Sequence, residues 1–417
     1  MEATTAVETV VRTSFGRLVA YLAARSRDVA GAEDALSEAL RAALATWPRD
    51  GVPEKPEAWL LAAARRRLID AARHRKVRAA AESAIESIIE EAATMANESK
   101  EFPDERLKLL FICAHPAIDA AARTPLILQA VLGLDAARIA SAFLMAPAAM
   151  GQRLVRAKGK IRDAGIAFAV PEAAELPERL EAVLAAIYAA YGTGWENAVG
   201  IDPGQRGLVE EALRLARVTA QLLPAEAEAK GLLALILFCE SRQAARRDAD
   251  GRFVPLAEQD VAKWSRPLVT EAEEVLTEAS RARRPGRFQL EAAIQSVHAQ
   301  RLFTGRTNWA AVARLHGALV CWTPTIGARV SYAAAMAQAG EPAAALTILD
   351  GLDAGSVAEY QAFWATRAHV LERMRRADAA RAAYRRASGL SSDAAVRAFL
   401  LERAARIGRG GDNSEFR

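Results

Sequence analysis

The sequence predicts an all-α fold, and three observations support that prediction. Alanine makes up roughly a quarter of the 417 residues, far above its average usage, and alanine loses no side-chain entropy on entering a helix. Aromatic residues, which strands favour, are only 6% of the chain. Apolar residues recur at helical spacing almost throughout, and we find no convincing period-two run bounded by turn residues. The length suits roughly two to four domains rather than one small module.

The first zone, residues 7–80, is expected to hold helices separated by a proline-rich loop. Three prolines and a glycine occur within residues 47–56, and together they exclude one continuous helix. In the helix before this loop, Asp34 and Glu38 are one turn apart, and Arg41 is placed to pair with Glu38. This acidic face indicates either a protein partner or an ordinary solvated surface, and the residues alone leave both interpretations open.

The helix that begins near Pro56 carries a basic cluster, residues 65–78. Trp59, Arg66 and Arg73 stand at heptad spacing on one side of this helix. An aromatic ring beside a row of arginines suits separated DNA strands, because a base stacks on the ring while the cations hold the backbone. A core tryptophan under a solubilising basic face is the alternative that this pattern leaves open.

Changes in charge and prolines mark the boundaries of the following segments. Residues 81–106 are strongly acidic and are interpreted as a linker. A second helical unit is expected over 107–168, before a boundary marked by Pro171. Residues 172–408 form one long series of helical patterns, and 409–417 are expected to be a disordered tail because apolar periodicity ends there.

The second unit contains a predicted helix-turn-helix. A helix over 135–143 is followed by a short turn at 144–147 and by a second helix over 148–164. The apolar stripe of the second helix consists of Met150, Leu154, Ala157 and Ile161. The polar and basic side chains opposite or beside this stripe are Gln152, Arg153, Arg156 and Lys160. Such a helix suits the DNA major groove, where arginine reaches guanine and lysine neutralises phosphate; a solvated charged face is the alternative.

The long C-terminal series contains a repeat. The motifs at Gly340 and Arg376 recur after about 36 residues, each following one helix and opening another, close to the tetratricopeptide (TPR) period of about 34. Ala380 and Tyr384 stand where that repeat packs a small residue under an aromatic one. The sequence therefore predicts a TPR-like helical domain, whose concave surface suits a further protein partner.

The sequence contains no convincing catalytic or metal-binding constellation. Cys113 and His115 are too close in an apolar run to face each other on a helix, so we expect them to be core residues. Three cysteines make neither a disulfide framework nor a zinc site, which favours the reducing cytoplasm. We find no secretion signal and no apolar run long enough to span a bilayer. We therefore expect a cytoplasmic protein that is not an enzyme, binds no metal or cofactor and contacts no membrane.

The net charge sets a further limit on function. The chain has 55 basic and 51 acidic residues, which leaves a net charge of only +4. This balance excludes a uniformly basic nucleic-acid-binding protein. It permits the local basic clusters described above, because charges of opposite sign occupy different segments.

Three segments, in this order, resemble bacterial extracytoplasmic-function (ECF) sigma factors of the sigma-70 family. The segments Ala32–Leu40, Pro56–Asp70 and Gln152–Lys158 look like parts of regions 2 and 4. Four further segments resemble the ECF subgroup with a long C-terminal TPR-like extension, namely Phe111–Pro116, Asp248–Gly251, Glu258–Trp264 and Gly286–His298. The resemblance extends from about residue 10 to residue 407, and the joint order of the segments is more specific than any one of them.

The resemblance implies a sigma factor that recruits core RNA polymerase to promoter DNA. It implies that residues 7–80 form the sigma-2 domain and that 107–168 form the sigma-4 domain. From its charge alone, we further expect the acidic linker between them to run in the positively charged channel of the polymerase. The residues implied in the core-binding helix are Asp34, Glu38 and Arg41. Those implied along the surface that melts the minus-ten element are Lys55, Trp59, Arg66 and Arg73. Those implied on the helix that reads the minus-thirty-five element are Gln152, Arg153, Arg156 and Lys160.

Two positions depart from the usual pattern of this family. Arg66 stands where asparagine is usual, and Arg138 stands where an acidic residue usually opens the helix-turn-helix. These departures support an alternative interpretation, in which the protein is a sigma-like interaction scaffold or adaptor without promoter-specific initiation. In the preferred interpretation, the C-terminal domain regulates the sigma domains in cis or offers a groove to another protein.

Overall fold

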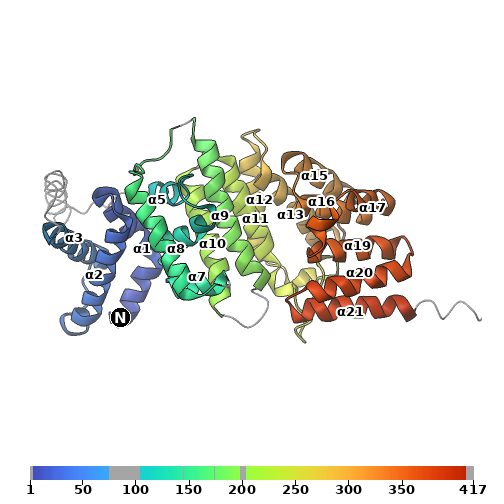
Figure 1. Cartoon of the computed structure of the whole chain (residues 1–417), viewed down its shortest axis with the longest axis horizontal. Helices are drawn as coiled ribbons and strands as arrows, with labels where there is room; N and C mark the ends of the chain where they lie inside the picture. Colours follow the sequence, from blue (N-terminus) through green and yellow to red (C-terminus); the bar gives the residue numbers. More distant parts are fainter. Residues whose placement is uncertain (1–2, 75–103, 144, 173, 198–202, 410–417) are drawn as a thin grey trace, which may run out of the picture. The chain divides into compact units, whose positions relative to one another are not determined.

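The computed structural model describes residues 3–74, 104–143, 145–172, 174–197 and 203–409 (Figure 1). Within these ranges every regular element is a helix, apart from one isolated β-bridge between residues 247 and 253. The prediction of an all-α fold is confirmed. Most of the linker expected over 81–106, and nearly all of the tail expected over 409–417, lies outside the described residues.

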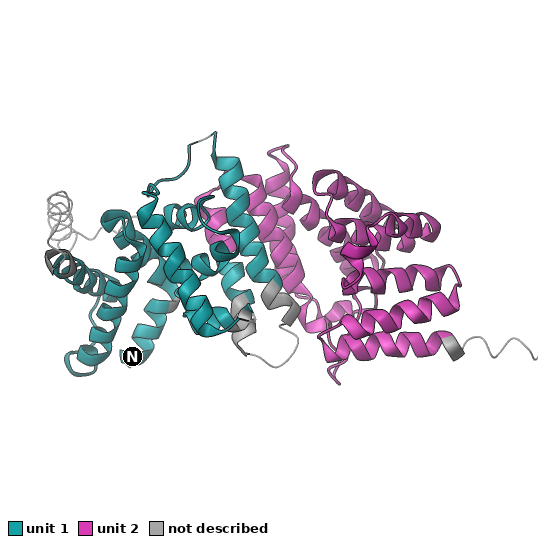
Figure 2. Cartoon of the chain, viewed as in Figure 1, with its two compact units in different colours: residues 1–196, 202–215 teal, residues 197–201, 216–417 magenta. Residues whose placement is uncertain are grey.

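The chain divides into two compact units, which Figure 2 shows in different colours. Unit 1 comprises residues 1–196 and 202–215, and unit 2 comprises residues 197–201 and 216–417. The division falls inside helix α10, Pro203–Leu222. The helix before it, α9, therefore belongs to the same unit as the predicted helix-turn-helix.

Unit 1 is assembled around the long first helix. Its helices are α1 Ala3–Ser26, α2 Val29–Asp50, α3 Pro56–His74, α5 Arg106–Cys113, α6 Ala120–Leu132, α7 Ala136–Ala142, α8 Pro147–Asp163 and α9 Leu176–Asn197. Helix α1 packs against α2, α3, α5 and α6, and α8 packs against α6 and α7. Leu18, Tyr21 and Leu22 in the C-terminal half of α1 are almost completely buried. Helix α1 is thus a core element shared by the two halves of unit 1, which are the helices α1–α3 and the helices α5–α8.

The proline-rich loop separates α2 from α3, as the sequence predicts. Pro48 is accommodated in the last turn of α2, and the helix ends at Asp50. Gly51 follows with φ of 86°, a backbone conformation that glycine adopts without strain. Helix α3 then starts at Pro56, because the fixed φ of proline and its missing N–H suit the first helical turn.

Unit 2 is a series of helices that pack mainly on their neighbours in the chain. Its elements are α11 Ala227–Ser241, η1 Gln243–Ala245, η2 Leu256–Glu258, η3 Val261–Lys263, α12 Arg266–Ser280, α13 Arg287–Ala299, α14 Arg301–Thr304, α15 Trp309–Trp322, α16 Ile326–Gln338, α17 Pro342–Asp350, α18 Ala354–Val357, α19 Gln361–Arg373, α20 Ala377–Leu390 and α21 Ala394–Arg409. The pairs α11–α12, α15–α16, α16–α17, α19–α20 and α20–α21 each pack together. Ala380 and Tyr384 of α20 are buried. The two repeated motifs, at Gly340 and Arg376, lie at the turn between α16 and α17 and at the turn between α19 and α20.

The segment between α11 and α12, residues 242–265, is tied to the C-terminal helix of the same unit. Arg247 forms an ion pair with Asp393, which immediately precedes α21, at 2.6 Å. Arg403 of α21 lies 3.7 Å from the carboxylate of Glu258. These contacts connect an early loop of unit 2 to its last helix, so the long connection has defined partners.

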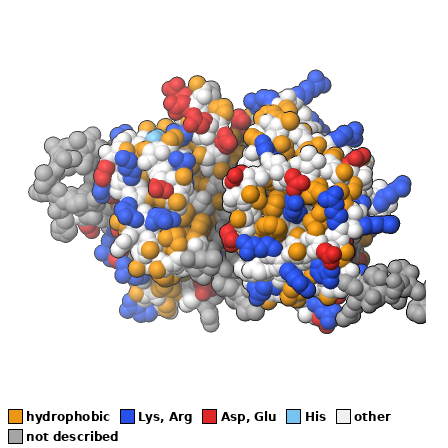
Figure 3. All heavy atoms as spheres, turned by 45° about the vertical axis from the view of Figure 1, so that its right-hand side comes forward, with side chains coloured by type: hydrophobic (Ala, Val, Ile, Leu, Met, Phe, Trp, Pro, Cys, Tyr) orange, Lys and Arg blue, Asp and Glu red, His pale blue; other side chains and the backbone are white. Residues whose placement is uncertain are grey.

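On the face shown in Figure 3, charged side chains of one sign do not gather into a large patch. Basic, acidic and hydrophobic side chains are intermingled there, and basic side chains project at its rim. This distribution agrees with the small net charge of +4. We therefore identify the candidate interfaces from the charged residues of single helices rather than from one large charged patch.

Candidate nucleic-acid and polymerase interface

Helix α8 presents the polar face that the sequence predicts. Its buried stripe consists of Met150, Leu154, Ala157 and Ile161. The side chains of Gln152, Arg156 and Lys160 are exposed, and their spacing of one helical turn aligns them in a row. One side of α8 is thus packed against the protein, while a row of hydrogen-bond donors faces solvent. This arrangement is suited to contact with base edges and phosphates in a DNA groove.

Two other basic residues of α8 are engaged with the protein itself. Arg153 is half-buried, and its Nη1 donates a hydrogen bond to the carbonyl oxygen of Ala121 in α6, at 3.4 Å. Lys158 forms an ion pair with Glu33 of α2. Helical spacing alone does not reveal this second partner, because it is 125 residues away in the chain.

Helix α2 carries the residues of the predicted polymerase-binding face. Asp28 caps its N-terminus, and the Oδ1 atom accepts the N–H of Gly31 at 3.0 Å. Asp34 and Arg41 are exposed, Glu38 is half-buried, and Arg41 forms the ion pair with Glu38 that their spacing predicts. An exposed pair on one helix contributes little to stability. These charges are therefore accessible to a partner surface.

Helix α3 and the residue before it carry the side chains predicted to contact separated DNA strands. Lys55 and Arg66 are exposed. Trp59 is half-buried, and its ring meets Trp47 of α2 edge to face, with the ring centroids 5.5 Å apart. The ring of Trp59 thus combines a packing contact with a partly accessible surface. Arg73 lies in the last turn of α3, and its side chain is outside the described part of the structure.

One arginine of the α3 basic cluster is turned into the core. Arg65 is only 7% exposed, and its Nη2 donates a hydrogen bond to the hydroxyl of Tyr21 in α1. Arg25 lies over the same ring, with its guanidinium carbon 3.6 Å from the centroid. Sequence reasoning counted Arg65 as part of the surface cluster. Its position one turn after Leu61, on the packing side of the helix, was the signal that could have placed it inside.

Cys113 and His115 form no reactive pair. Cys113 is fully buried, and burial raises the pKa of its thiol well above the usual range. The Nδ1 atom of His115 accepts the N–H of Ala117 at 3.1 Å within a local turn. Among the described residues, no group of His, Cys, Asp and Glu could hold a metal ion. None of the helices described here combines the length and the apolar content that crossing a bilayer requires.

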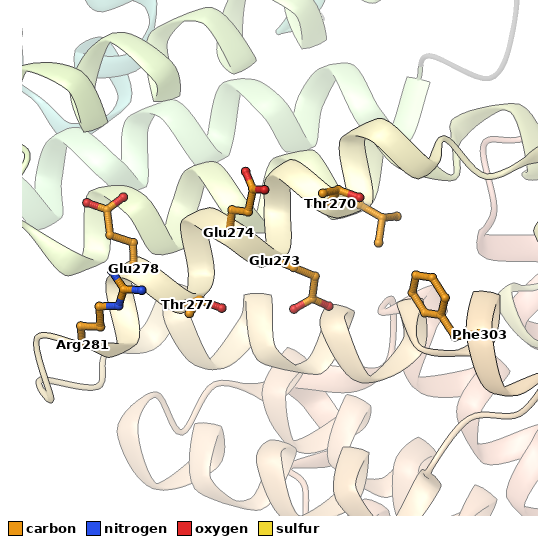
Figure 4. Close-up of a pocket in the computed structure, with 8 residues that line it drawn as sticks. Thr270, Glu273, Glu274, Thr277, Glu278, Arg281 and Phe303 are labelled. Carbon is orange, nitrogen blue, oxygen red and sulfur yellow. The ribbon is translucent and has the colours of Figure 1, made fainter.

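An open cavity of about 490 Å³ lies along α12 in unit 2 (Figure 4). Glutamates line it, among them Glu273 and Glu278, and the exposed ring of Phe303 lies at one end. Ser296 donates a hydrogen bond to Glu273 at 2.6 Å, and Lys230 forms an ion pair with Glu278. Both carboxylates therefore already have partners within the protein, and we assign no chemistry to this cavity.

Comparisons with known proteins show that two segments of the chain match family models. Residues 10–78 match the family model Sigma-70 region 2, a span that runs from α1 through α3. Residues 179–281 match a family of unknown function (DUF6596), a span that begins in α9 and ends just after α12. The N-terminal part of the chain is thus a sigma-70 region 2, which implies interaction with core RNA polymerase.

One relative matches nearly the whole chain. The uncharacterized protein R00370 of Rhizobium meliloti (strain 1021) is 36% identical over 391 residues, which cover 93% of this chain and 91% of that protein. The chain belongs to the same family as this relative, and its region 2 makes it a sigma-70 family factor. No solved structure matches the chain.

Proposed function

We propose that the protein is an ECF-type sigma factor, a cytoplasmic, non-enzymatic protein that acts without a cofactor. It recruits core RNA polymerase to specific promoters and initiates transcription there. Unit 2 acts as a TPR-like domain that regulates the sigma part in cis and offers a surface to a further protein partner. The observation that carries the proposal is α8, with its buried apolar stripe and the exposed row Gln152, Arg156 and Lys160.

Recognition of the minus-thirty-five element is assigned to α8. Arg156 stands at the centre of the exposed row, and an arginine in the major groove can bind the O6 and N7 atoms of guanine with two donors. Gln152 can pair with adenine, and Lys160 and Arg153 can neutralise neighbouring phosphates. The hydrogen bond from Arg153 to α6 would orient that guanidinium at the edge of the groove.

Contact with the minus-ten element is assigned to Lys55 and to α3. A flipped base can stack on the accessible part of the Trp59 ring, while Arg66 and Arg73 hold the backbone of the separated strand. The edge-to-face contact with Trp47 supports this role, because it fixes the plane of the Trp59 ring before DNA arrives.

Binding of core polymerase is assigned to α2. Asp34 and the Glu38–Arg41 pair give this helix a mixed but mainly acidic exposed face, which suits a partner surface with basic groups. The match to sigma-70 region 2 supports this assignment, because it includes the whole of α2.

The experiment that tests the proposal works without a known promoter sequence. Purified core polymerase is combined with the full chain, the complex selects DNA from a random pool, and the enriched sequences serve as templates for run-off transcription. We expect one enriched bipartite motif and a run-off product that depends on this chain. Tight binding to core polymerase with neither motif nor product would favour the scaffold alternative that Arg66 and Arg138 support. Steep salt dependence without a motif would indicate a general nucleic-acid-binding protein.

A pair of variants of α8 tests the assignment of the groove-reading face. Arg156→Ala should lower the preference for the selected motif over random DNA by roughly fivefold to a hundredfold, because one bidentate contact contributes about 1–3 kcal/mol of discrimination. Arg162→Ala is the matched control, since it removes the same charge from an exposed residue on another side of the same helix, where Arg162 forms an ion pair with the neighbouring Asp163. An equal loss of preference from both variants contradicts the assignment.

A further inference from the structure

The region 2 helices and the predicted helix-turn-helix are in direct contact within unit 1. Helix α1 packs on α5 and α6, and a Cβ on Gly16 would lie 1.8 Å from the carbonyl oxygen of Val131. A Cβ on Gly133, whose φ is 72°, would meet the ring of Phe15 at 2.7 Å. Both glycines therefore permit a close approach that any side chain would prevent. The two halves of unit 1 are closed on each other at this point.

A second contact joins the same two halves through one ion pair. The Nζ atom of Lys158 in α8 bonds to the Oε2 atom of Glu33 in α2, and the two side chains are only 12% and 11% exposed. A polar contact is thus enclosed where α2 and α8 meet.

This buried pair is only partly satisfied. The Oε1 atom of Glu33 is buried and has no hydrogen-bond partner among the described residues. Burial raises the pKa of Glu33, although the nearby Lys158 opposes this effect. Removal of two charges from water is costly, and apolar side chains of similar volume often hold such an interface as firmly or more firmly. A contact of this kind closes the two halves without making the closure permanent.

We propose that Lys158 and Glu33 form a latch that holds α8 against α2 and releases when the region 2 half and the helix-turn-helix half of unit 1 separate. The structure shows the closed form. In the open form both charges return to water, and their hydration offsets the loss of the pair. Opening exposes the apolar contact between α1 and α6, so the closed form is favoured until another surface takes the place of that contact.

The latch fixes the spacing of the candidate surfaces rather than covering them. Asp34 of α2 and both Gln152 and Arg156 of α8 are exposed in the closed form. Closure therefore sets the distance between the surface assigned to polymerase and the surface assigned to DNA, and opening changes it. This consequence rests on the proposed function, whereas the latch itself does not.

The test measures the distance between α2 and α8 in the full-length chain, without polymerase or DNA. Ala45 of α2 and Ala149 of α8 are exposed, so Ala45→Cys and Ala149→Cys can carry spin labels. The accessible native cysteines are removed by Cys239→Ser and Cys321→Ser, and the buried Cys113 is retained. Double electron–electron resonance then gives the distribution of distances between the two labels.

Two variants of the latch are compared in this labelled chain. Lys158→Met leaves Glu33 buried without its partner, so the ratio of open to closed chains should rise at least about tenfold. The double variant Glu33→Leu with Lys158→Met replaces the pair by apolar groups and should restore a single closed distance. Arg162→Met removes one positive charge from an exposed position on α8 and should leave the distribution unchanged.

The outcomes decide the proposal without reference to transcription. The proposal is overturned if the label-to-label distances of the Lys158→Met variant are distributed as in the chain with the native pair. It is also overturned if Arg162→Met opens unit 1 as much as Lys158→Met does. If Lys158→Met does not fold, the double variant decides: it must stay closed to at least the same urea concentration as the chain with the native pair, and a lower concentration overturns the latch. A failed run-off assay contradicts only the proposed function, because these distances do not depend on it.

Discussion

Arg179 of α9 donates a hydrogen bond to the carbonyl oxygen of Phe111 in α5, at 2.8 Å and across 68 residues of sequence. Phe111 lies in the last turn of α5, where helix carbonyls have no partner within their own helix. The Arg179 side chain, only 13% exposed, supplies that partner. The first helix of the span that matches DUF6596 is thus bonded to α5, which lies before α6 and the predicted helix-turn-helix in the chain.

This bond predicts where the chain can be shortened. A chain that ends after Val170 lacks α9 and leaves the carbonyl of Phe111 without Arg179, whereas a chain that ends after Leu222 retains α9 and α10. We expect the longer form to unfold cooperatively in urea and the shorter form to unfold at a clearly lower urea concentration. Equal midpoints for the two forms would show that α9 contributes nothing to unit 1.

A point substitution isolates the bond itself. Arg179→Ala in the full chain should lower the free energy of unfolding by about 1.5–3 kcal/mol, the usual range for a hydrogen bond that involves a charged group. Glu175→Ala is the control, since Glu175 lies 3.9 Å from Arg179, is 69% exposed and contributes little to stability. Comparable losses from the two variants, measured by urea unfolding, would refute the role given to Phe111.

A carboxylate from α11 caps helix α13, and its removal should destabilise unit 2. Glu228 accepts the N–H groups of Phe288 at 2.9 Å and of Gln289 at 3.1 Å. Glu228→Ala leaves these first-turn donors without a partner, so we expect a loss of about 1–3 kcal/mol in the free energy of unfolding. Glu226→Ala, which removes a nearby charge that caps no helix through its side chain, should have a much smaller effect in the same urea titration.

The same contact explains the glycine before α13. A Cβ on Gly286 would lie 2.3 Å from Cδ of Glu228. Gly286→Ala should therefore destabilise unit 2 by about 1–3 kcal/mol through overpacking. The combined Gly286→Ala and Glu228→Ala variant should lose less than the sum of the two single losses, because the second substitution removes the clash. Strict additivity in thermal unfolding would contradict this relationship.

Arg301 holds the connection between α11 and α12 by its planar guanidinium group. Nη1 donates to the carbonyl oxygens of Leu256 at 2.8 Å and Ala257 at 3.0 Å, and the group lies over Trp264, 4.9 Å from the ring centroid. Arg301→Lys should still lose about 1–3 kcal/mol of unfolding free energy, because an ammonium cannot reproduce this planar geometry. The exposed Arg306 provides the control Arg306→Lys, for which no measurable change is expected. Urea unfolding followed by circular dichroism measures both.

A buried histidine makes the stability of unit 2 depend on pH. Burial lowers the pKa of His298 to about 3 from an unperturbed 6.5, and the charge of Arg242 adds to the shift. The unfolded chain therefore binds this proton more strongly, so the contribution to stability is complete above pH 6.5 and is lost as the pH falls toward 3. Between about pH 7.5 and about pH 5 we expect a loss of about 2 kcal/mol from this residue.

The variant His298→Phe tests this dependence. Phenylalanine retains an aromatic ring beside Trp309, whose ring centroid lies 5.3 Å from that of His298, but it cannot take up a proton. Over the same pH interval the variant should lose about 2 kcal/mol less than the native chain in urea unfolding. An identical pH dependence of the two proteins would show that His298 is not the group responsible.

Features that depend on neighbouring residues could be predicted from the sequence. Helical spacing correctly identified Met150, Leu154, Ala157 and Ile161 as the buried stripe of α8. The spacing of three residues between Glu38 and Arg41 along the chain correctly predicted their ion pair. The same reasoning did not place Arg65 in the core, because three consecutive arginines look like one surface cluster until the packing side of the helix is known. The roles assigned to the candidate DNA and polymerase contacts are still predictions.

The sequence by itself determined the helical class, the turns at prolines and glycines, and the sides of single helices that face inward. Each of these properties depends on the conformational preferences of residues within a few turns of one another. Only the tertiary structure decided that Lys158 pairs with Glu33 and that Arg179 reaches Phe111, which are separations of 125 and 68 residues. A buried polar group takes the partner that packing brings within hydrogen-bond distance, and one-dimensional spacing carries no record of that choice.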